Sequence, residues 1–136
     1  MALEIEQRER EGIAVLDLKG RITAGPEAGA LRDKVAALNA AGERRLALEL
    51  GGVSYIDSTG LGALVMCATT LRRSGGDMKL VNLNRRNIEL LVMTKLVTIF
   101  EIFADEQDAV NSYYPGREIK TFDILDFVHK MKQQEE

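Results

Sequence analysis

Asp57, Ser58 and Thr59 are the residues of this chain best suited to chemistry, because they stand between an apolar run and a long stretch with helical periodicity. Asp and Ser side chains accept hydrogen bonds from the free N–H groups of a first helical turn. The pattern therefore predicts a helix that begins here, with Asp57 or Ser58 as its N-cap. We expect the Ser58 hydroxyl to lie at the surface, where the active site of a second protein could reach it.

Two glycines, Gly60 and Gly62, fall at the start of this predicted helix. Glycine inside a helix costs roughly 1 kcal/mol against alanine, so another requirement must favour both residues. Without side chains they leave the backbone around Ser58 open to close approach by another molecule. The alternative is that they relieve crowding against the neighbouring strand. Leu61 between them would be a contact residue if exposed and a core residue if buried.

The sequence does not indicate other kinds of catalytic site. Ile56 stands two residues before Ser58, where the nucleophile elbow of hydrolases needs glycine. The only histidine, His129, lies far along the chain, so a Ser-His-Asp triad would depend on a tertiary contact. One Cys and one His without clustered partners give no metal site, and no dinucleotide fingerprint or phosphate loop occurs. We expect no enzymatic activity, no cofactor and no metal.

The elements that must position Ser58 follow from alternating strand-like and helix-like periodicity. Segments 3–9 and 13–19 flank a turn at Arg10-Glu11-Gly12 and predict a hairpin. The expected elements that follow are a helix from Pro26 to Gly42, a strand around 46–50, a helix from Ser58 to Gly75, a strand at 78–83, a short helix around 88–92, a strand at 99–103 and a helix from Asp105 to about Tyr113.

Strands separated by helices of this length imply parallel neighbours with right-handed crossovers, after an antiparallel first strand. The predicted fold class is α/β. Ser58 follows the carboxyl end of the strand at 46–50, which is the usual place for ligands and partners in such sheets.

Four segments occur in the order and spacing of a known family. They are Asp57–Gly62 with the preceding Val53–Ile56, Gly20–Thr23 after the second strand, Gly75–Leu80 before the fourth, and Thr94–Phe100. Together they span about residues 3–113 and resemble the STAS-domain anti-sigma factor antagonists, the bacterial anti-anti-sigma proteins. The resemblance implies a mixed sheet, with the first strand antiparallel and the rest parallel, and helices mainly on one face.

The same resemblance implies a binding switch in which Ser58 accepts a phosphate. The unphosphorylated protein would bind an anti-sigma factor that is itself a serine kinase of the histidine-kinase-like ATPase fold, and so release a sigma factor. Phosphorylation would end that binding, and a serine phosphatase would restore it.

Roles for the neighbours of Ser58 follow by the same analogy. Asp57 either positions the Ser58 hydroxyl or caps the helix, and Thr59 could be a secondary acceptor. Segments 23–26 and 93–96 would lie near the same face. The residues expected to form the motif or contact the partner are Asp57, Thr59, Gly60, Leu61 and Gly62. The arginines expected to be solvated charges and not a docking patch are Arg21, Arg72, Arg73, Arg85 and Arg86.

Two other functions stay open. A STAS scaffold or transporter-associated module would bind without being phosphorylated, although such relatives often lack the serine; a transport-linked module would co-purify with membrane components. A small hydrolase or nucleotide-binding protein would lose turnover on Ser58→Ala, or would melt at a higher temperature with nucleotide.

Residues 1–114 are expected to form the STAS domain, and residues 115–136 a C-terminal helical extension outside the family pattern. Pro115-Gly116 interrupts the helical pattern, and an amphipathic stripe follows. Asp123 lies early in the stripe and Lys130 and Lys132 lie late, as the helix dipole prefers. This helix would fold back on its own domain, or dock on a partner or on a second copy in a homodimer. The stripe consists of Ile124, Phe127, Val128 and Met131.

Composition limits the classes of protein further. The 136 residues, 46% hydrophobic and 29% charged, suit one domain with a modest core. No apolar run approaches the ~20 residues of a membrane helix, and the acidic N-terminus is unlike a signal peptide. A net charge of -3 argues against a nucleic-acid surface. The single Cys67 fits a buried thiol. We expect a cytoplasmic bacterial protein without membrane or direct nucleic-acid contacts.

Overall fold

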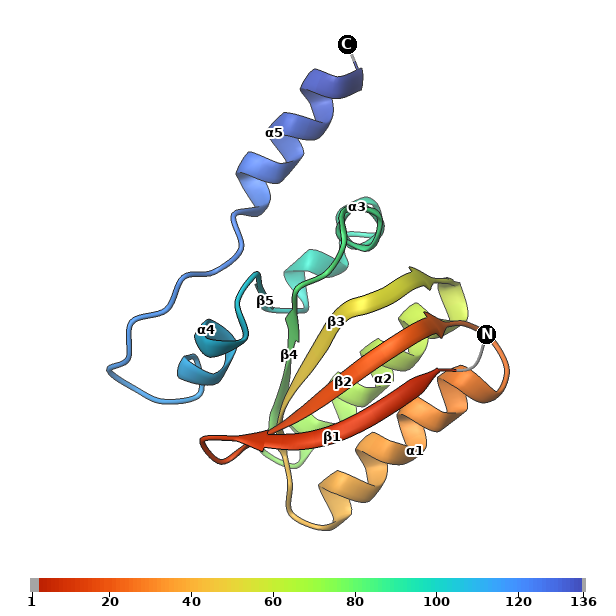
Figure 1. Cartoon of the computed structure of the whole chain (residues 1–136), viewed down its shortest axis with the longest axis vertical. Coiled ribbons are helices and arrows are strands. Elements are labelled where there is room, and N and C mark those ends of the chain that lie inside the picture. Colours follow the sequence, from red (N-terminus) through yellow and green to blue (C-terminus); the bar gives the residue numbers. More distant parts are fainter. Residues whose placement is uncertain (1–2, 136) are drawn as a thin grey trace.

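A five-stranded sheet forms the centre of the protein, and the computed structural model describes residues 3–135 (Figure 1). The strands are β1 (Glu4–Arg10), β2 (Ile13–Ile22), β3 (Arg45–Ile56), β4 (Asp77–Val81) and β5 (Ile102–Phe103). The helices are α1 (Pro26–Ala40), α2 (Ser58–Arg73), α3 (Arg85–Met93), the short 3-10 helix η1 (Leu96–Thr98), α4 (Glu106–Asn111) and α5 (Ile124–Glu135).

The strands lie in the order β1-β2-β3-β4-β5. β1 is antiparallel to β2, with Gln7 opposite Leu16, and the later neighbours are parallel, with Leu16 opposite Leu48 and Leu48 opposite Leu80. The predicted α/β class and the antiparallel first strand are therefore confirmed.

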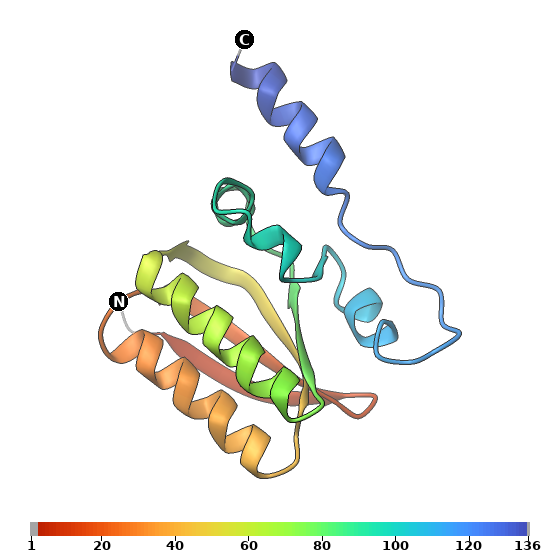
Figure 2. The ribbon, with the colours of Figure 1, turned by 180° about the vertical axis from the view of Figure 1, so that it is seen from behind.

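Helices cover the two faces of the sheet unequally. α1 and α2 lie side by side across one face (Figure 2), where Leu31 of α1 and Leu64 of α2 pack with Leu16, Leu48 and Leu80. The other face receives α4, whose Ala109 and Val110 pack with Ile13, Val15, Ala47, Val81 and Phe103. The helices are thus mainly on one face, as predicted, and both faces of β2 are apolar because both are covered.

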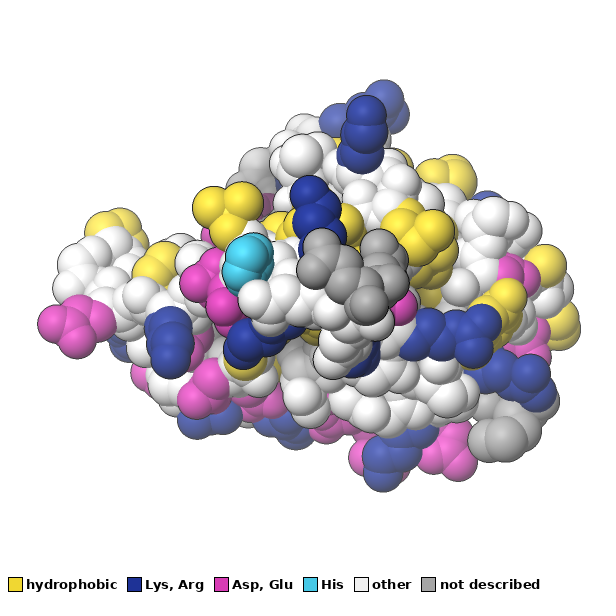
Figure 3. All heavy atoms as spheres, turned by 90° about the horizontal axis from the view of Figure 1, so that it is seen from above, with side chains coloured by type: hydrophobic (Ala, Val, Ile, Leu, Met, Phe, Trp, Pro, Cys, Tyr) yellow, Lys and Arg dark blue, Asp and Glu magenta, His cyan; other side chains and the backbone are white. Residues whose placement is uncertain are grey.

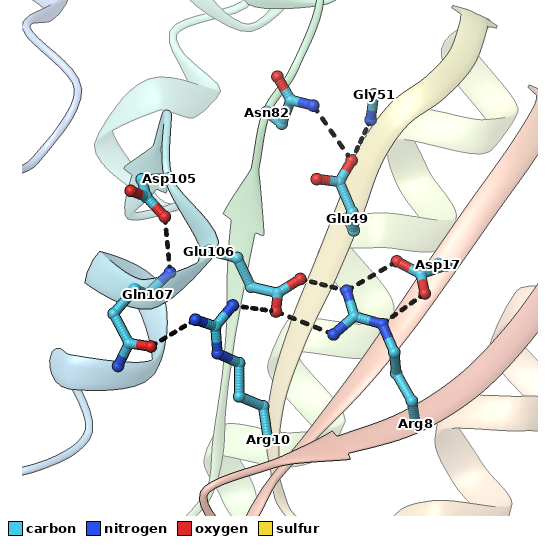
Figure 4. A network of polar contacts seen from close by, with 9 residues as sticks. All are labelled: Arg8, Arg10, Asp17, Glu49, Gly51, Asn82, Asp105, Glu106 and Gln107. Atoms are coloured by element: carbon cyan, nitrogen blue, oxygen red, sulfur yellow. Dashed lines mark hydrogen bonds and ion pairs between the residues drawn. The ribbon is translucent and has the colours of Figure 1, made fainter.

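Charged side chains join the β1–β2 hairpin to α4 (Figure 4). Arg8 donates to Asp17 (Nε to Oδ2, 2.6 Å) and to Glu106 (Nη1 to Oε2, 2.9 Å). Arg10 donates to Glu106 at 2.7 Å and to Gln107 at 2.6 Å. Hydrogen bonds from Arg8, and then from Arg10, hold the pKa of Glu106 below its usual range although burial opposes this. The network fixes α4 against the start of the chain.

A buried lysine strengthens the same side. The Lys79 ammonium donates to Asp77 at 3.1 Å and to Glu101 at 2.8 Å, and it lies 4.9 Å from the ring centroid of Tyr113. The Tyr113 hydroxyl donates to the carbonyl of Leu46 at 2.6 Å. The segment that follows α4 is therefore fixed to both β3 and β4.

Several element boundaries differ from those predicted. The strand expected at 99–103 contains only Ile102 and Phe103, because the N–H groups of Ile99 and Phe100 donate to the carbonyl of Leu96 and continue the turn of η1. The strand expected at 78–83 ends at Val81, since Asn82 has positive φ (58°). Gly20–Ile22 belongs to β2 and does not follow it.

The predicted C-terminal helix forms as α5, at the end of an extended segment (Figure 1). Phe122, Ile124 and Phe127 pack against the larger core cluster, where Phe122 and Phe127 line a hollow with Ile88 of α3, and their rings lie 5.8 Å apart. Leu125 on the same helix is 84% exposed. One side of the extension therefore contacts its own domain, while the boundary at residue 114 and the homodimer stay predictions.

Cys67 lies on α2 inside the core and is 3% exposed. Burial raises the pKa of its thiol to about 11. The expected buried thiol is confirmed.

Candidate functional site

The turn between β3 and α2 is organised by the carboxylate of Asp57. Its Oδ1 accepts the backbone N–H of Gly60 at 2.8 Å, and its Oδ2 accepts that of Ala24 at 3.0 Å. These bonds, from Gly60 first and Ala24 second, lower the pKa of Asp57, since they favour the ionised form. Asp57 is thus the N-cap of α2 and ties the β2–α1 loop to it. Of the two predicted roles for Asp57, helix capping is the one observed.

Gly60 and Gly62 have different physical roles. The backbone of Gly60 abuts the end of β2, because a Cβ atom there would lie 1.9 Å from the carbonyl oxygen of Ile22. Only glycine fits this contact, so the crowding alternative describes Gly60. A Cβ at Gly62 would meet nothing within 4 Å. Gly62 therefore leaves open space on the exposed side of α2.

Ser58 and Thr59 occupy the first turn of α2 and are exposed. Within residues 3–134, the Ser58 hydroxyl takes part in no side-chain hydrogen bond of the structure, whereas Asp57 beside it takes two. The first N–H groups of a helix and its dipole favour an anion at this position. Leu61 is only 7% exposed and belongs to the core, so it is not a surface contact in this structure.

A depression of about 280 Å³ opens beside Ser58 at the junction of β3, α2 and α3. Met93 on its rim is 75% exposed. From above, hydrophobic side chains lie at the surface between Lys and Arg side chains (Figure 3). The residues that line the depression are Tyr55, Ile56, Asp57, Ser58, Arg86, Asn87, Glu89, Leu90 and Met93.

Two asparagines fix α3 beside the depression. Asn84 is the N-cap of α3, and its side chain also donates to the carbonyl of Val53 at 3.1 Å. Asn87, which is buried, donates to the same carbonyl at 3.0 Å. Neither residue was predicted to belong to the site. Asn84 before a helical pattern is an N-cap signal that could have been recognised, but the bonds to β3 leave no trace in local sequence.

Arg86 stands out among the arginines expected to be solvated charges. Its guanidinium carbon lies 4.5 Å from the ring centroid of Tyr55, and its side chain lines the depression beside Ser58. Arg72 instead donates to Asp77 at 2.8 Å, and Arg85 donates to Glu89 at 2.8 Å. Arg86 is exposed, as expected of a solvated charge, and it also lines the depression beside Ser58; the prediction that it is not part of a docking patch stays a prediction.

The segments expected near this face are found there. Ala24 of the 23–26 loop bonds to Asp57, and Met93 from the 93–96 segment lines the depression. His129 instead interacts with Gln133 on α5 and does not line the depression. Among the residues that the structure describes, no group of three or more His, Cys, Asp or Glu could hold a metal ion. Across the same residues, no helix combines the length and apolar character needed to cross a membrane.

The chain is similar to proteins already known. A family model for the STAS domain matches residues 4–109. The anti-sigma-B factor antagonist of Bacillus subtilis (strain 168) is 34% identical over 110 residues, which cover 81% of this chain and 99% of that protein.

Solved structures agree in fold. An anti-sigma factor antagonist from Mycobacterium paratuberculosis superposes with a TM-score of 0.71 at 20% identity, covering 82% of this chain and 93% of the other. The Bacillus cell fate determinant SpoIIAA in its phosphorylated form superposes with a TM-score of 0.62 at 18% identity, covering 82% of this chain and 99% of the other. At these identities the likeness concerns the fold alone.

Proposed function

This chain belongs to the STAS domain family of anti-sigma factor antagonists, and from that premise we propose that it is a binding switch controlled by phosphorylation of Ser58. Unphosphorylated, it binds an anti-sigma factor that is a serine kinase of the histidine-kinase-like ATPase fold, and a sigma factor is released. Phosphorylation of Ser58 ends the binding, and a serine phosphatase restores it. The protein acts through partners in the cytoplasm and needs no cofactor.

The main support for this proposal is the exposed position of the Ser58 hydroxyl. Its hydroxyl is exposed at the first position of α2, while the neighbouring carboxylate of Asp57 is engaged by the N–H groups of Gly60 and Ala24. The helix therefore does not depend on Ser58 for its cap. A kinase can modify this hydroxyl without breaking a bond that holds the turn.

The fold should tolerate the phosphate. A phosphate adds about -1.5 to -2 charges at neutral pH. At the start of α2 this charge faces free N–H groups and the positive end of the helix dipole, which offset repulsion from Asp57. Phosphorylation should therefore change binding and not the structure of the domain.

A partner docked on this face would respond differently. The exposed Met93 and the half-buried Leu90 offer apolar contact area beside Ser58. A phosphate at the edge of such an interface must lose water or face repulsion. A penalty of only about 3 kcal/mol weakens binding more than a hundredfold.

Phosphopeptide mass spectrometry of the protein from its native cells, grown with and without stress, tests the proposal. We expect a single phosphate on Ser58 whose occupancy changes between the conditions and which is lost in Ser58→Ala. Thr59→Ala is the matched control and should keep the modification. Absence of phosphate at residue 58 in every condition would overturn the proposal in favour of an unmodified scaffold.

A further inference from the structure

We propose that Arg86 binds the phosphate carried by Ser58 and is the phosphate-recognition residue of this protein. The inference rests on the proposed phosphorylation of Ser58 and assigns to a second side chain, on a different helix, the task of holding the modified state. It concerns a residue outside the Asp57–Gly62 motif.

Geometry supports Arg86 because it shares one depression with Ser58. Ser58 begins α2, Arg86 lies in the first turn of α3, and both line the same 280 Å³ hollow. The Arg86 guanidinium is stacked 4.5 Å from the Tyr55 ring centroid. Stacking on an aromatic face orients the planar group but leaves its N–H donors free at the edge. Those donors can form two parallel hydrogen bonds to two oxygens of a phosphate.

The acidic residues that line the depression bond to groups other than Arg86, which leaves Arg86 available to bind an anion. Its acidic neighbours are Asp57, which accepts two backbone N–H groups, and Glu89, which accepts Arg85 at 2.8 Å. Arg86 forms no ion pair with a carboxylate of residues 3–134, whereas Arg85 next to it does. A guanidinium kept beside an acceptor serine without a carboxylate partner is suited to an anion that arrives later.

A second arginine increases the positive potential on this side. Arg21 of β2 lines a neighbouring hollow together with Ser54, Tyr55 and Arg86. Arg21 does not line the depression that holds Ser58, so it adds positive potential beside Arg86 and is not a second phosphate ligand. A phosphate held by Arg86 would occupy the depression that Leu90 and Met93 also line, and would place charge beside the apolar contact area of the unmodified surface.

Phosphorus NMR on the full chain tests the assignment, with phosphoserine placed at residue 58 during translation so that no kinase is needed. The second pKa of phosphoserine is about 6. An adjacent guanidinium favours the dianion, so we expect this pKa to lie about 0.5 lower in the native sequence and to return toward 6 in Arg86→Gln. Arg86→Lys keeps the charge without the fork and should fall between them.

Arg73→Gln is the matched control, because it removes one positive charge at the far end of α2, roughly 22 Å away by helix rise. It should leave the phosphoserine pKa unchanged. Equal values in Arg86→Gln and the native sequence overturn the proposal, and so does an equal change in Arg86→Gln and Arg73→Gln, which would mean only a long-range charge effect. This result is separate from the cell experiment, since it does not depend on whether a kinase modifies Ser58.

A direct readout accompanies the titration. Contact with the phosphate should shift the side-chain Nε–H resonance of Arg86 between the unmodified and the phosphoserine protein, while that of Arg73 stays in place. An Arg86 resonance that does not move on phosphorylation would contradict the contact even if the pKa changed.

Discussion

The α4 side of the sheet and the surface around Ser58 use polar side chains in opposite ways. On the α4 side, Glu106 meets both Arg8 and Arg10, and the pKa of its carboxyl is lowered accordingly. Around Ser58, counting residues 3–134, the hydroxyl makes no side-chain hydrogen bond and Arg86 no ion pair, while the Arg86 guanidinium lies over the ring of Tyr55. In the first region the polar side chains bond to one another and hold the domain together. In the second region polar groups remain available to bind other molecules.

A fold tolerates chemical modification where the added group disturbs no existing contact. A charge added inside the α4 network would meet partners already arranged for one another. A charge added at Ser58 meets free helix N–H groups and disturbs no existing bond. If the two regions are separable, changes at Ser58 alter binding and changes in the α4 network alter stability.

Phosphorylation of Ser58 should give the largest effect, a loss of affinity for the anti-sigma factor. Phosphoserine at residue 58 should weaken the complex with the anti-sigma factor more than a hundredfold, while the free energy of unfolding changes by no more than about 1 kcal/mol. Calorimetric titration and urea denaturation measure the two quantities. Phosphoserine at Ser74, the C-cap of α2, is the control and should lower stability without weakening binding, because the dipole there repels a negative charge. A reversed pattern would mean that the Ser58 end is structural.

Gly60→Ala should give the next largest effect, a loss of about 2 to 3 kcal/mol of stability. The added Cβ would lie 1.9 Å from the Ile22 carbonyl oxygen, so the backbone must shift. Gly62→Ala, where nothing lies within 4 Å, should instead stabilise α2 by up to about 1 kcal/mol. Urea denaturation of both variants decides the matter, and equal effects of the two substitutions would refute the assignment of different roles.

Glu106→Gln should cost about 1 to 2 kcal/mol, because it leaves Arg8 and Arg10 without their shared carboxylate. The value stays modest since both arginines are partly exposed. Binding at Ser58 should not change. Glu4→Gln removes an equal charge from an exposed position of β1 and should have little effect on the unfolding free energy. If Glu106→Gln impaired binding but not stability, the division between the regions would be wrong.

The pH dependence of stability that the Glu106 network contributes should be the smallest of these effects. The folded-state pKa of Glu106 is lowered below 4.5 by Arg8 and Arg10, so its contribution to stability is fully present above 4.5 and is lost as the pH falls through the folded-state value. Melting temperatures measured from pH 7 to pH 3 should therefore fall less steeply in Glu106→Gln. Identical slopes in the two proteins would show that the network adds no pH-dependent stability.

The sequence predicted the elements around Ser58 well, because local patterns determine them. Apolar periodicity placed the strands and helices, and the polar residues before the helical stretch predicted a cap at Asp57 or Ser58, of which the structure shows Asp57. The strand predicted at 99–103 was correct only for Ile102 and Phe103, since periodicity alone does not separate the start of a short strand from the end of a 3-10 turn.

What the sequence did not predict depends on contacts between distant segments. The clash that makes Gly60 necessary involves Ile22, and the orientation of Arg86 depends on Tyr55. Neither pair has a signature in local spacing. Arg86 was therefore grouped with other surface arginines, although its surroundings differ from those of Arg72 and Arg85.

The buried thiol of Cys67 makes the protein suited to site-selective labelling. With a pKa of about 11, only about one molecule in ten thousand carries the reactive thiolate at pH 7. A cysteine introduced as Ser58→Cys would be exposed at a helix N-terminus, where the pKa of a thiol falls below its usual 8.5. A fluorophore or spin label could therefore be attached at residue 58 alone, with the native cysteine left in place.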